Sequence, residues 1–201
     1  MAYWKRTHTT LAAILTAALT ATLFTAPTHA KELAIWDQLQ GTNPKGYVLL
    51  MRHALAPGVG DPENFNVNDC STQRNLSDEG RQDARDIGQW LQRREVKILR
   101  VESSRWCRAK ETAQLLNIGK VRPNRNLDSL FQETNLESHP QTANIKKRIQ
   151  SHRNTRGLLV FVGHFVNFQA VAGVSLDSGE GVLIKATPSG EFKVMGYSPK
   201  P

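Results

Sequence analysis

Arginine and histidine residues stand directly after three short apolar runs of the sequence. They are Arg52-His53 after residues 46–51, Ser103-Ser104 with Arg105 and Arg108 after residues 98–101, and Gly163-His164 after residues 158–162. In open α/β sheets, ligands bind beyond the carboxyl ends of the strands. Guanidinium groups match the oxygen atoms of phosphate. If the runs are strands of one sheet, the spacing therefore predicts a single anion-binding pocket.

The apolar runs are continuous, as is typical of strands buried on both faces, and segments with helical spacing separate them. The predicted strands are 46–51, 98–101, 158–162, 182–186 and 192–195, and the predicted helices are 77–93, 106–116 and 145–152. Ser77 is the expected cap of the first helix. We predict an α/β fold, a single three-layer domain. It has a mostly parallel sheet with helices on both faces and a C-terminal hairpin at the edge.

The first thirty residues are predicted to be a secretory signal peptide. Lys5 and Arg6 precede an uncharged apolar stretch, and Thr28-His29-Ala30 offers small residues where a signal peptidase cleaves. The alternative is an uncleaved N-terminal anchor. Residues 31–201 then form the domain, which we expect to be periplasmic or secreted, with no later membrane-spanning segment.

The composition is that of an ordinary globular chain. Of 201 residues, 39% are apolar and 22% are charged, which excludes a disordered chain and leaves room for one domain. The net charge of +8 favours anionic partners, such as a phosphorylated small molecule or an acidic glycolipid. A charge that only keeps the protein soluble is the alternative. The basic residues form no nucleic-acid-binding motif, so nucleic acid is not an expected partner.

Four segments carry motifs in a recognisable order. They are Leu50-Met-Arg-His-Ala54, Asn75-Leu-Ser-Asp-Glu-Gly80, Ser103-Ser-Arg-Trp-Cys-Arg-Ala-Lys-Glu-Thr-Ala113 and Val162-Gly-His164. Together they resemble the histidine phosphatase superfamily, in its phosphoglycerate mutase-like branch. Ala54, where the wider family has Gly, and Asp69-Cys-Ser-Thr-Gln-Arg-Asn75 are similar to an exported subgroup. That subgroup includes lipopolysaccharide core heptose-phosphate phosphatase.

The resemblance implies a role for each residue of the pocket. His53 would be the nucleophile, because a neutral imidazole can attack phosphorus and form a phosphohistidine. Arg52 and Arg108 would bind the phosphate oxygens, and His164, if protonated, would add another cationic donor.

Other candidates are less well defined by the motifs. Arg105 and Arg74 are further substrate-binding candidates, although Arg105 stands where the family often has Pro and Arg74 is equally a solvated loop cation. For the proton donor we favour Glu133 over Glu180 and Glu137. Glu180 is also a substrate-binding candidate, and a solvated surface carboxylate is the alternative for each.

Cys70 and Cys107 flank two of the motifs. In an oxidising compartment we expect them to form a disulfide, and two separate buried thiols are the alternative. No metal-ligand spacing unites the histidines, so we expect no metal and no cofactor. His139 and His152 lie in polar segments and are expected at the surface.

These residues predict an exported phosphomonoesterase that acts through a phosphohistidine on a sugar phosphate, with a lipopolysaccharide core heptose phosphate as one candidate. One alternative is a phosphohistidine protein phosphatase, which a signal peptide disfavours. The other is a non-catalytic phosphate-binding module of the envelope, which the nucleophile disfavours because binding alone does not require it.

Overall fold

The computed structural model describes Met1 and residues 35–198. The predicted signal peptide, Met1 apart, lies outside the described residues. The strands are β1 (Tyr47–Arg52), β2 (Ile98–Ser103), β3 (Val121–Pro123), β4 (Leu158–Gly163), β5 (Gly181–Ala186) and β6 (Phe192–Tyr197). Residues 35–39 are helical, and the later helices are α2 (Asp78–Arg93), α3 (Cys107–Leu115), α4 (Pro140–His152) and α5 (Phe165–Ala172), with 3-10 turns at Cys70–Thr72 and Arg125–Leu127.

The six strands form one mixed sheet in the order β3-β2-β4-β1-β5-β6. The first four strands are parallel to one another. β5 runs antiparallel to β1, and β6 runs antiparallel to β5, so the last two strands form a hairpin at the edge. The predicted fold class is therefore confirmed.

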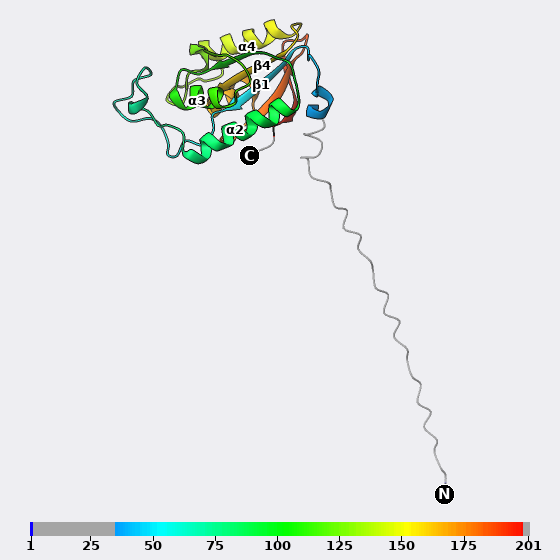
Figure 1. Cartoon of the computed structure of the whole chain (residues 1–201), viewed down its shortest axis with the longest axis horizontal. Helices are drawn as coiled ribbons and strands as arrows, with labels where there is room; N and C mark the ends of the chain where they lie inside the picture. Colours follow the sequence, from blue (N-terminus) through cyan, green and yellow to red (C-terminus); the bar gives the residue numbers. More distant parts are fainter. Residues whose placement is uncertain (2–34, 199–201) are drawn as a thin grey trace.

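Helices cover both faces of the sheet (Figure 1). Alternate residues of a strand point to opposite faces. In β1, Leu49 and Met51 pack in the core with α2 and α3, while Val48 and Leu50 pack in the core with α4 and α5. This double burial explains why β1 and β4 read as continuous apolar runs.

Most predicted elements are present, with shifts at their ends. The predicted helix at 145–152 begins earlier, at Pro140, a residue favoured in the first turn. Two elements are not among those predicted: β3, which is three residues long and ends in Pro123, and α5, whose apolar residues do not form a single stripe.

One surface prediction is wrong. His152 is 1% exposed, and its Nε2 lies 2.9 Å from the carbonyl oxygen of Gly157. The end of α4 packs this side chain against the turn before β4, although its neighbours in sequence are polar. His139 is half-buried and caps α4, since its Nδ1 accepts a hydrogen bond from the backbone N–H of Gln141.

The start of α2 holds the chain that follows β1. Ser77 Oγ accepts a hydrogen bond of 3.0 Å from the backbone N–H of Gly80, as expected of a cap. A Cβ atom at residue 80 would lie 2.2 Å from the carbonyl oxygen of Leu55. Glycine therefore allows α2 to approach the segment just after His53.

Candidate active site

The carboxyl ends of three neighbouring strands meet at one edge of the sheet. Arg52 is paired in register with Gly163, and Ser103 with Val162. The backbone N–H of His53 donates to the carbonyl oxygen of Gly163 at 2.9 Å, so the first histidine is fixed beside the second motif. The parallel register thus brings the three predicted groups together.

A cavity of about 680 Å³ opens at this edge. Six of the residues predicted from the sequence line it: Arg52, His53, Arg74, Arg108, Glu133 and His164. Aromatic side chains also line it, namely Phe65, Trp106, Phe131 and Phe165. Both cationic and aromatic side chains therefore line the cavity.

His53 is held in one tautomer. The ring is 3% exposed, and its Nδ1 lies 2.7 Å from the carbonyl oxygen of Ala54. A carbonyl oxygen can only accept, so Nδ1 carries the proton and Nε2 keeps its lone pair. Burial, together with the nearby charges of Arg108, Arg52 and Arg74, lowers the pKa of His53 to about 3. His53 is therefore a neutral base at physiological pH.

His164 lies beside His53, with ring centroids 5.4 Å apart and planes at 68°. Its Nε2 is 3.0 Å from Ser104 Oγ, which is in turn 3.4 Å from Asp128 Oδ1. The carboxylate can only accept, so the hydroxyl donates to it and accepts from His164 Nε2. Burial and the neighbouring cationic groups hold the pKa of His164 well below its usual value. A bound phosphate dianion would favour its protonated form.

Two arginines are fixed beside the histidines. Arg108, on the first turn of α3, is 2% exposed. Arg52 Nη1 donates to the carbonyl oxygen of Leu176 at 3.1 Å, and its guanidinium lies 5.0 Å from the centroid of the Phe165 ring. Among the described residues, no acceptor meets the buried Nε of either arginine.

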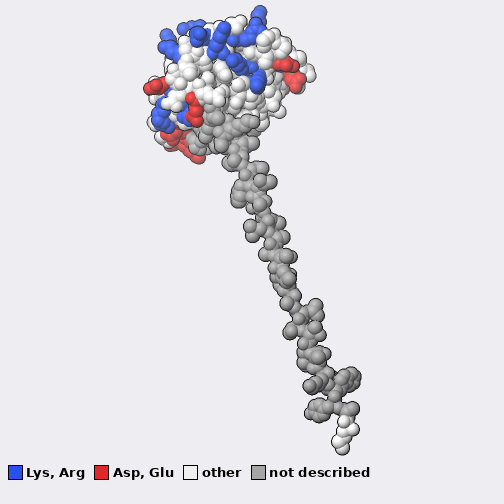
Figure 2. Space-filling view, turned by 90° about the vertical axis from the view of Figure 1, so that its right-hand side faces the viewer, with Lys and Arg blue, Asp and Glu red and all other residues white. Residues whose placement is uncertain are grey.

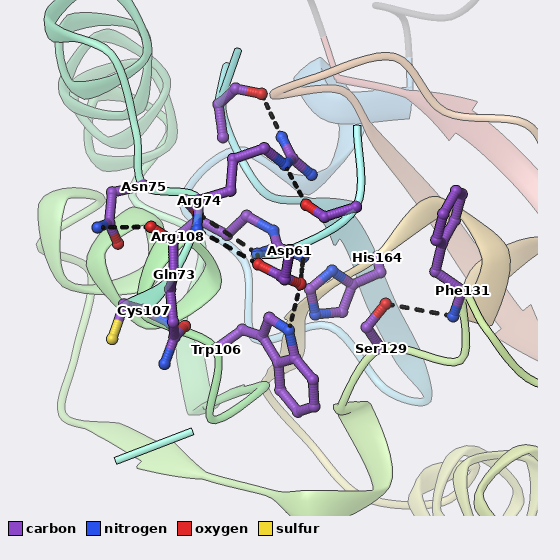
Figure 3. A network of polar contacts seen from close by, with 12 residues as sticks. Asp61, Gln73, Arg74, Asn75, Trp106, Cys107, Arg108, Ser129, Phe131 and His164 are labelled. Carbon is purple, nitrogen blue, oxygen red and sulfur yellow. Dashed lines mark hydrogen bonds and ion pairs between the residues drawn. The ribbon is translucent and has the colours of Figure 1, made fainter. Parts of the chain in front are cut away.

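Asp61, which no motif of the sequence indicates, lines the same cavity (Figure 3). Its Oδ1 and Oδ2 accept hydrogen bonds from Arg108 Nη1 at 2.6 Å and Nη2 at 3.1 Å. Trp106 Nε1 donates to Oδ2 at 3.0 Å, and the backbone N–H of Arg74 donates to Oδ1 at 3.3 Å. Asp61 lies in the irregular loop between β1 and α2, where no periodic pattern indicates which side chains point inward. Its place between two loop glycines and Pro62 was the only signal in the sequence.

Two other predicted substrate-binding residues lie outside the cavity lining. The Arg105 guanidinium pairs with the carboxylate of Asp128, with Nε to Oδ2 at 2.7 Å. Glu180 Oε2 accepts from the backbone N–H of Asp177 at 2.8 Å. The backbone carbonyl of Glu180 accepts from the N–H of Arg52, so this residue helps to fix β1.

The carboxylates predicted as proton donors differ in position. Glu133 is exposed and lines the cavity. Glu137 lines a separate surface hollow together with Asn135 and Gln169.

Cys70 and Cys107 form a disulfide, with Cα atoms 5.7 Å apart. Gln73, just beyond Cys70, accepts a hydrogen bond at its side-chain oxygen from the backbone N–H of Cys107 at 2.8 Å. Both links join the loop after β1 to the residue that precedes Arg108.

Within the described part of the chain, no group of three or more His, Cys, Asp or Glu side chains is arranged to hold a metal ion. No helix in residues 35–198 has the length and apolar character needed to cross a bilayer.

This arrangement suits transfer of a phosphoryl group. Phosphoryl transfer depends mainly on positioning and on neutralising the oxygens of the transferred group, which buried guanidinium groups can do. A neutral imidazole with a free Nε2 can act as the nucleophile.

Comparison with known proteins agrees with this chemistry. The family described as the histidine phosphatase superfamily (branch 1) matches residues 48–157, more than half of the chain. No curated protein matches the chain.

Several solved structures share the fold. The protein histidine phosphatase SixA, complexed with tungstate, is 17% identical over 76% of this chain and 96% of that chain, with a TM-score of 0.57. A mycobacterial glucosyl-3-phosphoglycerate phosphatase is 14% identical over 77% and 99%, with a TM-score of 0.51. A variant of a phosphoserine phosphatase from Entamoeba histolytica, in complex with phosphoserine, is 14% identical over 76% and 96%, with a TM-score of 0.53. Similarity at this level of identity shows the fold alone. The family match over more than half of the chain shows that it belongs to the histidine phosphatase superfamily (branch 1) and is a phosphatase.

Proposed function

We propose that this phosphatase is an exported phosphomonoesterase that hydrolyses a sugar phosphate through a phosphohistidine at His53. The observation that carries the proposal is the hydrogen bond from His53 Nδ1 to the carbonyl oxygen of Ala54. It leaves the lone pair on Nε2 of a neutral ring that lines a cavity with Arg52, Arg108 and His164.

In the first step, His53 Nε2 forms a bond to phosphorus while the bond from phosphorus to the ester oxygen breaks. Arg52 and Arg108 neutralise the oxygens of the transferred group. In the second step, water attacks phosphorus, the bond to Nε2 breaks, and inorganic phosphate leaves. Splitting the hydrolysis in this way replaces one difficult displacement with two easier ones.

The volume and lining of the cavity support a sugar phosphate as the substrate. The volume of about 680 Å³ is in the range of sites that hold small molecules. Phe65 and Trp106 stack with centroids 4.8 Å apart and form an apolar wall suited to the C–H face of a sugar. The similarity of the motifs to the exported subgroup favours a heptose phosphate of the lipopolysaccharide core as the physiological substrate.

Export is supported by two features. The predicted signal peptide at residues 1–30 would direct the chain out of the cytoplasm. The disulfide between Cys70 and Cys107 suits an oxidising compartment such as the periplasm.

The test compares wild type, His53→Ala and His139→Asn on a panel of sugar phosphates and on a phosphohistidine-bearing protein. We expect His53→Ala to lose activity by roughly 10³-fold or more and to trap no acid-labile phosphoryl group after a rapid quench. His139→Asn, outside the cavity and with its cap preserved, should retain activity.

Two results would contradict the proposal. Turnover near the wild-type rate by folded His53→Ala protein would reject the nucleophile. Faster hydrolysis of the phosphohistidine-bearing protein than of every sugar phosphate would favour a protein phosphatase instead.

A further inference from the structure

The carboxylate of Asp61 forms an ion pair with the guanidinium of Arg108 (Figure 3). Both terminal nitrogens of Arg108 donate to it, at 2.6 and 3.1 Å, and the indole N–H of Trp106 donates at 3.0 Å. The Arg108 side chain is 3% exposed and that of Asp61 is 15% exposed. A carboxylate in this place makes the two parallel N–H···O bonds that a phosphate would make.

Substrate and Asp61 therefore compete for the same donors. A phosphate bound to Arg108 through both terminal nitrogens requires the carboxylate to move away. Asp61 lies outside any helix or strand, so moving its side chain breaks no hydrogen bond of a helix or strand, while Arg74 Nε holds the neighbouring carbonyl oxygen of Gly60 at 2.8 Å. Gly58 and Gly60 precede Asp61 with φ angles of 90° and 71°, and Val59 between them is 85% exposed.

We propose that Asp61 gives up Arg108 to the substrate phosphate and then donates the proton to the leaving group. The inference rests on the proposed phosphohistidine mechanism and supplies the proton donor for a phosphomonoester whose leaving group is an alcohol.

Replacement of the Asp61 carboxylate by phosphate on Arg108 favours the protonated form of Asp61. In the unliganded protein, burial raises the pKa of Asp61, but the hydrogen bonds and charge of Arg108, with the bonds from Trp106 and Arg74, outweigh burial and hold the pKa below its usual value. Loss of the Arg108 contact removes the largest of these lowering effects. The negative charge of the bound phosphate acts in the opposite direction and favours the protonated acid.

The proton balance closes over two steps. As the substrate phosphate replaces it on Arg108, the Asp61 carboxylate takes up a proton from solvent. As the bond between His53 Nε2 and phosphorus forms, the bond from phosphorus to the ester oxygen breaks, and this proton moves to that oxygen. Asp61 is then a carboxylate. It takes a proton from the attacking water as the bond from phosphorus to Nε2 breaks, which restores the acid.

Glu133, the donor favoured by the sequence, is the other candidate in the cavity. It is exposed and lines the cavity. Asp61, in contrast, is joined to the phosphate-binding arginine itself, so substrate binding changes its state directly.

The test compares kcat for two substrates of different leaving group. A sugar phosphate needs a proton on its leaving alkoxide, whereas p-nitrophenyl phosphate releases a stable phenolate that does not. In Asp61→Asn we expect kcat to fall by roughly 10²–10⁴-fold on the sugar phosphate and by less than about tenfold on p-nitrophenyl phosphate. Asp61→Glu, which keeps a carboxyl group, should recover part of the sugar phosphate activity.

Control variants and thermal unfolding accompany these measurements. Asp69→Asn removes a carboxylate from the same loop, outside the cavity lining and with the cap of the Cys70–Thr72 turn preserved, and should keep the wild-type ratio between the two substrates. If Asp61→Asn does not fold, the comparison of Asp61→Glu with wild type carries the test. The inference is then supported if kcat of Asp61→Glu falls more on the sugar phosphate than on p-nitrophenyl phosphate, by a smaller factor than that expected for Asp61→Asn.

Three outcomes would overturn the inference. They are an equal loss on both substrates in the Asp61 variants, a gain on both substrates in Asp61→Asn, or a leaving-group-dependent loss in Glu133→Gln without one in Asp61→Asn. Asp61→Asn should still form the phosphohistidine at His53 when it is given p-nitrophenyl phosphate. That result would support the proposed function even where the role of Asp61 is overturned. If even wild type forms no phosphohistidine, the proposed function itself fails.

Discussion

His53 and His164 are bases buried among arginines, and this environment decides their state. Burial and the nearby positive charges both disfavour the imidazolium form. The pKa of His53 is lowered to about 3, and that of His164 lies well below its usual value. The cationic pocket that receives the phosphate therefore also keeps the nucleophile unprotonated, so both functions come from one arrangement of charge.

The lowered pKa of His53 predicts a loss of stability in acid. The unfolded chain titrates at the ordinary value of 6.5, so between pH 6.5 and 3 it binds a proton that the native state does not. Above pH 6.5 both states are neutral and the effect vanishes. As the pH falls from 6.5 towards 3, the free energy of unfolding should therefore decrease by at most about 1.4 kcal/mol per pH unit because of this one group.

Urea unfolding of wild type and His53→Asn at pH 7, 6 and 5 measures this effect. The variant should lose less stability than wild type as the pH falls. Parallel curves for the two proteins would show that His53 is protonated normally in the folded state.

At the scale of the elements, α3 and the loop after β1 are fastened together around Arg108. The disulfide joins Cys70 to Cys107. Thr112, one turn after Arg108, accepts a hydrogen bond from the backbone N–H of Ala54 at 3.0 Å and donates to the carbonyl of Arg108 at 2.7 Å. Through Thr112, the start of α3 that carries Arg108 is therefore linked to the end of β1, next to His53.

Reduction of the disulfide should lower stability and activity together. The bridge closes a loop of 37 residues, for which the chain-entropy model gives about 3–4 kcal/mol. At 2–4 °C per kcal/mol, Tm should fall by roughly 6–16 °C. A shift of Arg108 by about 1 Å would cost on the order of 10²-fold in rate.

The matched control is the double variant Cys70→Ser/Cys107→Ser, which should behave like reduced wild type and not respond to reductant. Free thiols in unreduced protein would remove the premise, and a wild-type rate after reduction would show that the bridge does not position Arg108.

At the scale of the whole molecule, positive charge is not confined to the site. Figure 2 shows Lys and Arg side chains spread over one face of the globular part, with fewer Asp and Glu side chains. Lys45, Lys97 and Arg156 are exposed and precede β1, β2 and β4, so they stand at the amino ends of the strands, away from the cavity. The full chain has a net charge of +8, and +6 remains without Lys5 and Arg6 of the predicted signal peptide; this positive charge should attract a phosphate dianion from a distance.

The long-range attraction predicts a salt dependence of kcat/KM. The Debye length shortens from about 30 Å at 0.01 M salt to about 3 Å at 1 M, so kcat/KM for a sugar phosphate should fall over this range. The rate at saturation should change less, because the bound phosphate is shielded from solvent. The triple variant Lys45→Gln/Lys97→Gln/Arg156→Gln, with an intact cavity, should show a shallower slope, and identical slopes would reject steering by this charge.

Local patterns in the sequence determined most of the architecture. The runs at β1 and β4 are apolar because both faces of these strands are covered, and Ser77 caps α2 as its position predicts. The order of strands and helices implied a parallel sheet, and parallel strands carry their carboxyl ends to one edge. For this reason the sequence pattern predicts that Arg52, His53, Arg108 and His164 lie in one pocket.

Only the tertiary structure decided which loop residues enter that pocket. Asp61 reaches Arg108 across 47 positions of sequence, through a loop without periodicity, so no local signal ties them together. Arg105 stands three residues before Arg108, yet its guanidinium pairs with the carboxylate of Asp128, 23 positions further along the chain. Strand ends are fixed by hydrogen bonding that repeats along the chain. Loop side chains are fixed by contacts between distant segments, and those exist only once the chain has folded.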